Sequence, residues 1–70
     1  MHIVINGQPR EFTELSDSAT LADLVAALGL QGNRVAVEHN GSIVSRSEWP
    51  GTAIHSNDKF EIVHFVGGGV

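Results

Sequence analysis

The stretch that decides the fold is Lys59–Val66, which reads KFEIVHFV. It is rich in β-branched and aromatic residues, a composition that predicts a β-strand. Side chains of a strand alternate between the two faces of its sheet. We expect Phe60 and Ile62 to face the core. Val63 and Phe65 then point to the opposite, open face, where neighbouring exposed apolar side chains indicate a docking patch.

Two Asn-Gly pairs upstream of this strand, Asn6-Gly7 and Asn40-Gly41, predict β-hairpins. Both residue types tolerate the positive φ that a type I′ turn requires. The expected strands are His2–Ile5 and Gln8–Leu15 around the first turn, and Arg34–His39 and Ser42–Ser45 around the second.

One helix is expected between the hairpins, over Thr20–Leu28. Its apolar residues recur at helical spacing, at Leu21, Leu24, Val25 and Leu28. Thr20 is the expected N-cap, with Asp23 at the matching position of a capping box. Gly29 is expected to end the helix.

The order of elements is hairpin, helix, hairpin, irregular crossover and final strand. The crossover, Trp49–Asn57, contains the turn-forming pair Pro50-Gly51, and Trp49 is expected to anchor it in the core. A sheet with one helix across its face closes such a chain, with the first and last strands as parallel neighbours. This is the β-grasp arrangement of ubiquitin-like proteins, an α+β fold with a mixed sheet of about four to five strands. We expect one domain over residues 1–66 and a flexible Gly-rich tail over residues 67–70.

Composition narrows the range of partners. The chain has 70 residues, no cysteine and a formal net charge of −4. Its basic residues are few and spread singly, so we do not expect the chain to bind nucleic acid. An acidic domain of this kind is expected to bind a basic patch on another protein. Met1–Val4 already reads as a strand rather than a signal peptide, and no apolar run reaches membrane-spanning length. We therefore expect a cytoplasmic protein that is a monomer when free.

No internal catalytic or metal site is predicted. The histidines, which are His2, His39, His55 and His64, lack ligand spacing and are expected to be solvated. The carboxylates form no evident acid/base pair, and no serine is marked as a nucleophile. We therefore expect no bound cofactor.

The tail Gly67-Gly68-Gly69-Val70 is the remaining candidate for chemistry. Glycine loses the most freedom on ordering and has no side chain to pack, so a run of glycines is unfavourable within a fold. The same run suits a narrow channel, and three extended residues reach about 10 Å. That length is enough to carry a terminal carboxylate into the active site of another protein. We expect Val63, Phe65 and Val66 to bind that protein.

The chain resembles the sulfur carriers of thiamine biosynthesis, the ThiS family. The resemblance is carried by Val35-Ala36-Val37-Glu38, Asn40-Gly41, Arg46-Ser47-Glu48-Trp49 and Phe60–Gly69. Relatives of the family include the small subunit of molybdopterin synthase and ubiquitin. The resemblance implies that the carboxylate of Gly69, at the end of Gly67 and Gly68, is adenylated and converted to a thiocarboxylate. It further implies two partners: a ubiquitin-activating-like adenylyltransferase that uses ATP and magnesium, and thiazole synthase, which consumes the sulfur. The chain itself is then a carrier and not an enzyme.

Val70 departs from the family pattern, in which the chain ends on the glycine that carries sulfur. Either a peptidase removes Val70, or the natural gene ends differently, or the chain cannot be charged. Three other functions stay open at this point. They are a carrier of the same mechanism for molybdopterin or another sulfur metabolite, a ubiquitin-like modifier of lysines, and a non-catalytic interaction domain.

Overall fold

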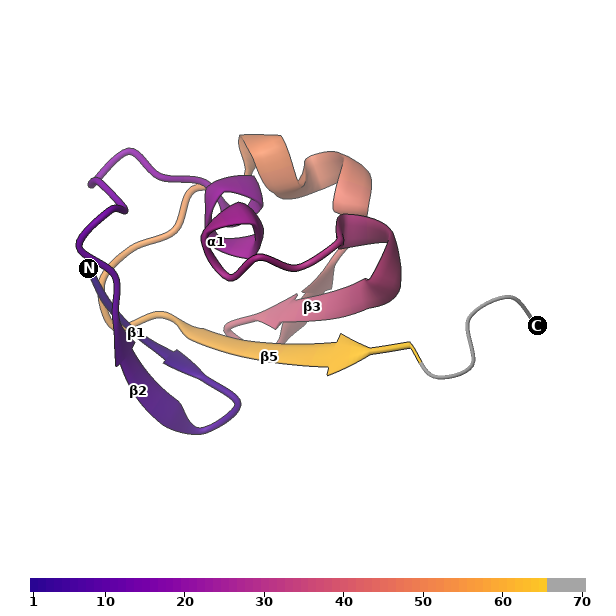
Figure 1. Ribbon diagram of the computed structural model, residues 1–70, viewed down its shortest axis with the longest axis horizontal. Coiled ribbons are helices and arrows are strands. Elements are labelled where there is room, and N and C mark those ends of the chain that lie inside the picture. The colour runs from indigo at the N-terminus through magenta and orange to yellow at the C-terminus, as the bar shows by residue number, and fades with distance from the viewer. Residues whose placement is uncertain (66–70) are drawn as a thin grey trace.

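A mixed sheet of five strands, in the order β2-β1-β5-β3-β4, forms one layer of the protein (Figure 1). The computed structural model describes residues 1–65. The strands are β1 (His2–Ile5), β2 (Gln8–Glu11), β3 (Val35–His39), β4 (Ser42–Val44) and β5 (Lys59–His64). β5 lies in the middle of the sheet, parallel to β1 and antiparallel to β3. The predicted central position of the last strand and the predicted β-grasp fold are both confirmed.

Helix α1 (Leu21–Ala27) covers one face of the sheet (Figure 1). The predicted capping box is present: the Asp23 backbone N–H donates to Thr20 Oγ1 at 3.3 Å, and the Thr20 backbone N–H donates to Asp23 Oδ2 at 2.8 Å. Gly29 follows the helix with a φ of 71°, a conformation that costs glycine little. These signals set both ends of the helix within one residue of the expected positions.

The core lies between α1 and the sheet. Leu21 and Leu24 of the helix are 0% exposed. The central strands contribute alternate residues to the same core, namely Ile3, Ile5, Val35, Val37, Phe60 and Ile62. The predicted burial of Phe60 and Ile62 is thus confirmed, and it leaves the intervening side chains of β5 on the other face of the sheet.

Strand β2 ends at Glu11, although the sequence predicted a strand as far as Leu15. The prediction was wrong because β1 offers only four residues to pair with, and its register with β2 ends at the pair His2–Glu11. Phe12 still exchanges two backbone hydrogen bonds with Met1, at 2.9 and 2.8 Å, and the chain then leaves the sheet before Leu15; the two side chains are only 6% and 8% exposed. Their apolar character reflects burial in the core from a loop, not a strand.

Two short 3₁₀-helices, η1 (Gly32–Arg34) and η2 (Arg46–Gly51), flank the second hairpin. The sequence predicted strand at Arg34 and Ser45 and an irregular crossover after them, and it predicted neither 3₁₀-helix. Elements this short carry no measurable apolar period. Trp49 of η2 is the expected anchor: it is 4% exposed, and its indole N–H donates to the backbone carbonyl of Val44 at 2.9 Å.

The described part of β5 ends at His64, whereas the sequence predicted a strand through Val66. Val66 and the residues 67–70 lie outside the described residues. The expected boundary between a domain of residues 1–66 and a tail of residues 67–70 therefore stays a prediction.

Candidate docking site at the end of strand β5

Val63 and Phe65 lie on the face of the sheet that α1 does not cover. Val63 is 61% exposed and Phe65 is 55% exposed, whereas the alternate residues Phe60 and Ile62 are buried. The predicted orientation of these side chains is confirmed. Val63 is the second-last residue of β5, and Phe65 directly follows the strand.

The neighbouring strands extend this apolar surface. Ala36 of β3 pairs directly with Val63, and Ile43 of β4 pairs with Glu38 of β3 on the same face. Ile43 is 78% exposed, the highest value among the large apolar side chains that the structure describes. We call Ala36, Ile43, Val63 and Phe65 the open-face patch. Sequence reasoning missed Ile43, although its position next to an Asn-Gly hairpin turn could have placed it.

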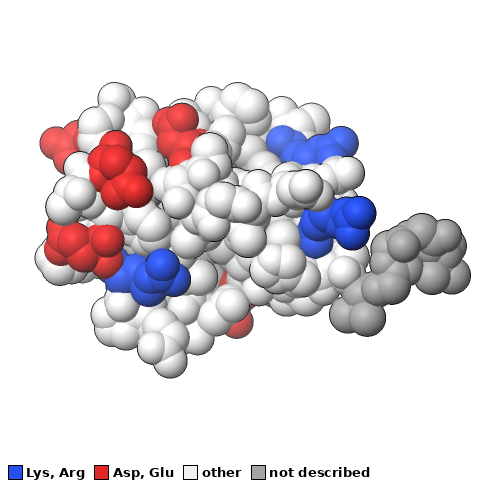
Figure 2. All heavy atoms as spheres, in the orientation of Figure 1, with Lys and Arg blue, Asp and Glu red and all other residues white. Residues whose placement is uncertain are grey.

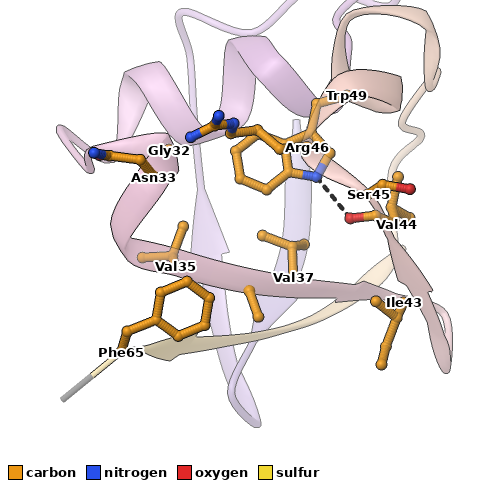
Figure 3. A pocket seen from close by; sticks show the side chains of 11 residues that line it. Gly32, Asn33, Val35, Val37, Ile43, Val44, Ser45, Arg46, Trp49 and Phe65 are labelled. Atoms are coloured by element: carbon orange, nitrogen blue, oxygen red, sulfur yellow. Dashed lines mark hydrogen bonds between the residues drawn. The ribbon is translucent and has the colours of Figure 1, made fainter. Parts of the chain in front are cut away.

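A groove of about 380 Å³ borders the open-face patch (Figure 3). Trp49 and Arg46 lie on one side of β3 in this view, and Phe65 and Ile43 lie toward the other. Gly32 permits the close approach of η2, because a Cβ at this position would lie 3.1 Å from Cζ3 of Trp49. The groove is lined mainly by apolar side chains, and it widens the surface that a protein partner can bury.

Charge is unevenly distributed around this site. Figure 2 shows basic groups beside the end of β5, whereas acidic groups gather toward the opposite end of the molecule. Arg34 and Arg46 each line a groove together with Phe65. Glu14 and Asp23 line a separate hollow beside α1. The open face itself carries Glu38 and Glu61, which pair with each other beside the patch, so the basic groups lie at its border and not within it.

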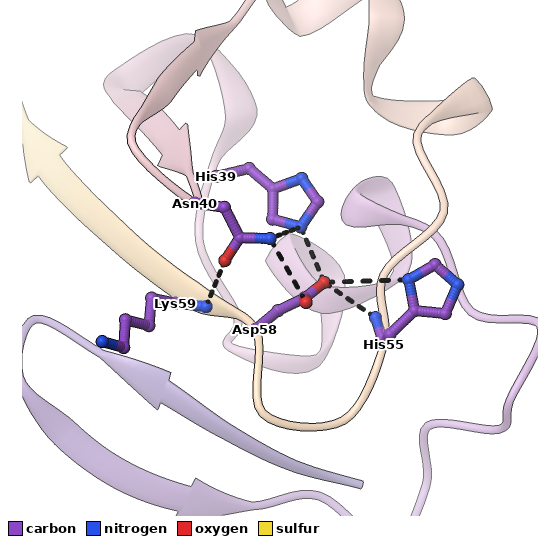
Figure 4. Close-up of polar contacts among 5 residues, drawn as sticks. All are labelled: His39, Asn40, His55, Asp58 and Lys59. Atoms are coloured by element: carbon purple, nitrogen blue, oxygen red, sulfur yellow. Dashed lines mark hydrogen bonds and ion pairs between the residues drawn. The ribbon is translucent and has the colours of Figure 1, made fainter.

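A second polar cluster lies at the start of β5, away from the patch (Figure 4). Nε2 of His39 lies 2.7 Å from Oδ2 of Asp58, and the His39 ring stacks on Phe60 with a centroid distance of 4.8 Å. The His39 side chain is only 16% exposed, so the expectation that all four histidines are solvated is wrong for this one. The pairing could not be predicted from local sequence, because His39 and Asp58 lie 19 positions apart in different hairpins and loops.

Asp58 is the acceptor at the centre of that cluster. Its carboxylate also accepts from the backbone N–H of His55 at 2.9 Å and from Nδ2 of Asn40 at 3.3 Å. Burial raises the pKa of the carboxyl, but these hydrogen bonds and the interaction with His39 outweigh burial and hold the pKa below the ordinary value of 3.8. No serine or threonine hydroxyl bonds to His39 among residues 1–65, so the described contacts make the cluster a structural tie.

Within the described residues, no three histidine, aspartate or glutamate side chains gather as a potential metal site. In the same part of the chain, every helix is too short or too polar to cross a membrane. The remaining site residues that the sequence predicted, Val66, Gly67, Gly68 and Gly69, lie outside the described residues. The roles predicted for these four residues therefore stay predictions.

The fold and this surface define a class, the ubiquitin-like β-grasp domains. The model of the ThiS family matches residues 3–69, nearly the whole chain, and the chain belongs to that family. The resemblance seen in the sequence is thus confirmed.

Named relatives agree with this assignment. The sulfur carrier protein ThiS of Bacillus subtilis is 40% identical over 53 residues, which cover 76% of this chain and 80% of that protein. The crystal structure of the thiamine biosynthesis protein (ThiS) from Geobacter metallireducens has a TM-score of 0.83 and 31% identity, and it covers 99% of this chain and 100% of that one.

Thiazole synthases form a second group of relatives. That of Paramagnetospirillum magneticum is 45% identical over 69 residues, which cover 99% of this chain but 20% of the synthase. That of Magnetococcus marinus is 38% identical over 69 residues, with the same 20% share. The chain therefore spans a fifth of the length of these two relatives.

Proposed function

We propose that this chain carries sulfur for the synthesis of the thiamine thiazole. The observation that carries the proposal is the open-face patch: exposed Val63 lies near the end of the central strand and exposed Phe65 follows the strand, two positions before Gly67 in the sequence. A patch in this position lets a partner bind the domain while the residues after Phe65 enter its active site. Family membership and the likeness to the Bacillus subtilis sulfur carrier support the choice of sulfur as the cargo.

The proposed chemistry takes place on the carboxylate of Gly69. An α-carboxylate is ionised at neutral pH, because its pKa is about 3.5, and it is a poor electrophile. In the first step a carboxylate oxygen attacks the α-phosphorus of ATP, and pyrophosphate leaves with magnesium bound by the activating enzyme. In the second step a persulfide sulfur attacks the acyl carbon, and AMP leaves. Reductive cleavage of the resulting acyl disulfide by a thiol then yields the thiocarboxylate.

Two partners are required by this scheme. One is a ubiquitin-activating-like adenylyltransferase, which supplies the ATP site, and the other is thiazole synthase, which consumes the sulfur. The second partner is supported by the two thiazole synthases that contain a segment similar to this chain. In this scheme the chain binds no cofactor and acts as a substrate of both enzymes.

The test is intact-mass spectrometry of the chain ending at Gly69. It is incubated with ATP, magnesium, the adenylyltransferase of the same organism and a cysteine-derived persulfide donor. We expect a gain equal to the mass difference between sulfur and oxygen, and loss of that gain when thiazole synthase and its substrates are added. A chain that never gains this mass would overturn the proposal. A ladder of conjugates on lysines of other proteins would instead identify a modifier.

A further inference from the structure

The two edges of β5 are used unequally. On one side, β3 pairs with β5 from Val35–His64 to His39–Phe60. On the other side, β1 pairs only at Val4–Lys59 and Ile5–Phe60. Figure 1 shows the tip of the β1–β2 hairpin ending beside β5 well before its arrowhead.

Asn6 fills the next position on this edge with its side chain. Its Oδ1 accepts from the backbone N–H of Ile62 at 2.7 Å, and its Nδ2 donates to the Ile62 carbonyl at 3.1 Å. The Asn6 backbone N–H donates to the carbonyl of Phe60 at 2.9 Å. On the edge of β5 that faces β1, the backbone hydrogen-bonding groups therefore have partners as far as Ile62.

His64 is the next residue whose backbone points to this side. The Phe65 N–H donates to the Arg34 carbonyl at 2.9 Å, which places the backbone groups of Phe65 on the β3 side. Backbone groups alternate along a strand, so the N–H and C=O of His64 point the other way. No hydrogen bond to either group is formed by residues 1–65, and His64 is an exposed residue. Such an unpaired edge is a template for an added strand.

Two grooves with mixed apolar and polar linings meet beside this edge. One, of about 280 Å³, is lined by Ile5, Leu28, Leu30, Ile62 and His64, together with Asn6 and Arg10. The other, of about 370 Å³, shares Leu30 and His64 and continues past Gly29 and Arg34 to Phe65. A strand paired with the backbone of His64 would direct alternate side chains into these two grooves. The edge of β5 and the grooves therefore form one binding surface.

The charge on this surface selects an acidic partner. Arg10 lines the first groove and Arg34 lines the second. Neither groove has an aspartate or glutamate among its described lining residues. The surface is thus basic at both ends in a chain whose formal net charge is −4.

We propose that the activating enzyme adds an extended strand to β5 at His64. In this arrangement one apolar side chain of the enzyme's segment fills the groove at Leu28 and Leu30, and an acidic side chain pairs with Arg10 or Arg34. The inference rests on the proposed function, because the partner is the enzyme that charges the tail. The enzyme would then contact the chain in two places. One is the open-face patch, and the other is the edge of β5 that faces away from β3, where backbone hydrogen bonds would hold β5 just before the reacting segment.

The first test compares His64→Pro with His64→Ala. Proline removes the N–H and places its ring on the unpaired side, and it breaks no hydrogen bond with β3. Alanine removes the imidazole and keeps the N–H. We expect His64→Pro to raise the KM for the chain in adenylation by at least about tenfold, with a smaller change for His64→Ala. A thermal melt of each variant checks that both are folded.

The second test uses the unsubstituted chain, so it stands even if the proline variant does not fold. Hydrogen exchange at the His64 amide is followed by mass spectrometry with and without the adenylyltransferase. We expect rapid exchange in the free chain and at least about tenfold slowing in the complex.

Unchanged exchange at His64 in the complex, or equal KM values for folded His64→Pro and His64→Ala, would overturn the inference and leave the proposed function intact. An unsubstituted chain that is never charged would overturn both.

Discussion

At the scale of single residues, Asn6 performs two tasks that no other residue type combines. Its backbone adopts a φ of 51°, which asparagine tolerates better than most residues. Its side-chain amide presents one acceptor and one donor to the backbone of Ile62, much as a neighbouring strand would. The sequence predicted the turn from the Asn-Gly pair. It did not predict the tie to Ile62, because that contact spans 56 positions of the chain.

Substitutions at Asn6 separate these two tasks. Asn6→Gly keeps the positive φ but leaves both backbone groups of Ile62 without partners, at a cost of about 1–3 kcal/mol. Asn6→Ala loses the same bonds and adds about 1–2 kcal/mol of left-handed strain. Urea unfolding should therefore rank the free energies of unfolding as asparagine, then glycine, then alanine. Stability of the alanine variant equal to that of the unsubstituted chain would contradict the assigned role.

Asp58 makes the stability of the fold depend on pH at the acidic end. Its folded pKa lies below the ordinary value of 3.8, so the unfolded chain takes up a proton on this group at higher pH than the folded chain. The stabilisation is fully present above that value and is lost as the pH falls through the folded pKa.

Asp58→Asn should accordingly destabilise the fold at neutral pH, by about 1.5–3 kcal/mol, the usual contribution of a hydrogen bond to a charged group. The difference in unfolding free energy from the unsubstituted chain should shrink as the pH falls below 3.8. Urea titrations at a series of pH values measure it. A difference that does not change with pH would show that the charge of Asp58 contributes nothing to stability.

At the scale of elements, α1 contributes three buried apolar side chains to the core from a segment of seven residues. Leu24 is 0% exposed, whereas Leu28, the C-cap, is only partly buried. Leu24→Ala should cost about 2–5 kcal/mol of unfolding free energy, because it leaves a cavity. The matched control Leu28→Ala removes the same atoms from a more solvent-exposed site, so it should lower the unfolding free energy by less. Equal losses in chemical denaturation would show that burial at Leu24 is not the cause.

The open-face patch behaves differently, since its three large side chains, Ile43, Val63 and Phe65, are exposed in the described domain. Phe65→Ser and Ile43→Ser should change the unfolding free energy by no more than about 0.5 kcal/mol. Both should raise the KM for the chain in adenylation, because the partner loses apolar contact area. Titration calorimetry with the adenylyltransferase measures the same loss directly. An unfolded Phe65→Ser variant would place Phe65 in the core, and normal affinity would remove the patch from the docking surface.

The sequence predicted those elements that carry a strong local signal. The capping box, the two Asn-Gly turns and the alternation in β5 each rest on residues close together in the chain. The segments it mispredicted depend on distant partners. β2 stops where β1 ends, and η2 forms where Trp49 meets Gly32. For the site, it predicted Val63 and Phe65 from alternation, and it missed Ile43 and the pair His39–Asp58, which only the assembled sheet brings together.

At the scale of the whole molecule, one strand connects the rigid core to the proposed chemistry. β5 pairs with strands on both sides, and Phe60 and Ile62 anchor it beneath α1. Val63, His64 and Phe65 then present side chains or backbone to solvent immediately before the segment that would react. A partner that binds this end of β5 restricts the position of the residues that follow it. The number of residues after the bound end of β5 therefore determines where the terminal carboxylate lies.

This dependence on length predicts opposite behaviour for two chains that fold alike. With Val70 present, the terminal carboxylate lies one residue, roughly 3.5 Å, beyond the carboxylate of Gly69. Reacting atoms must meet within about 3–3.5 Å, and a misplacement of 1 Å costs on the order of 10²-fold in rate. The branched Cβ of valine also obstructs a channel that suits glycine. A chain ending at Gly69 should gain sulfur from ATP, donor and adenylyltransferase, whereas one ending at Val70 should not.

A longer chain should behave like the one ending at Val70, because any residue after Gly69 converts its carboxylate into an amide that cannot attack ATP. Cleavage after Gly69 should then restore charging, whichever residues it removes. Intact-mass spectrometry of the two chains, with matched thermal melts to confirm equal folding, measures the yield of thiocarboxylate. Equal yields would mean that the channel of the partner accommodates an additional residue. The reacting carboxylate would then be placed by the channel itself rather than by its distance from the end of β5.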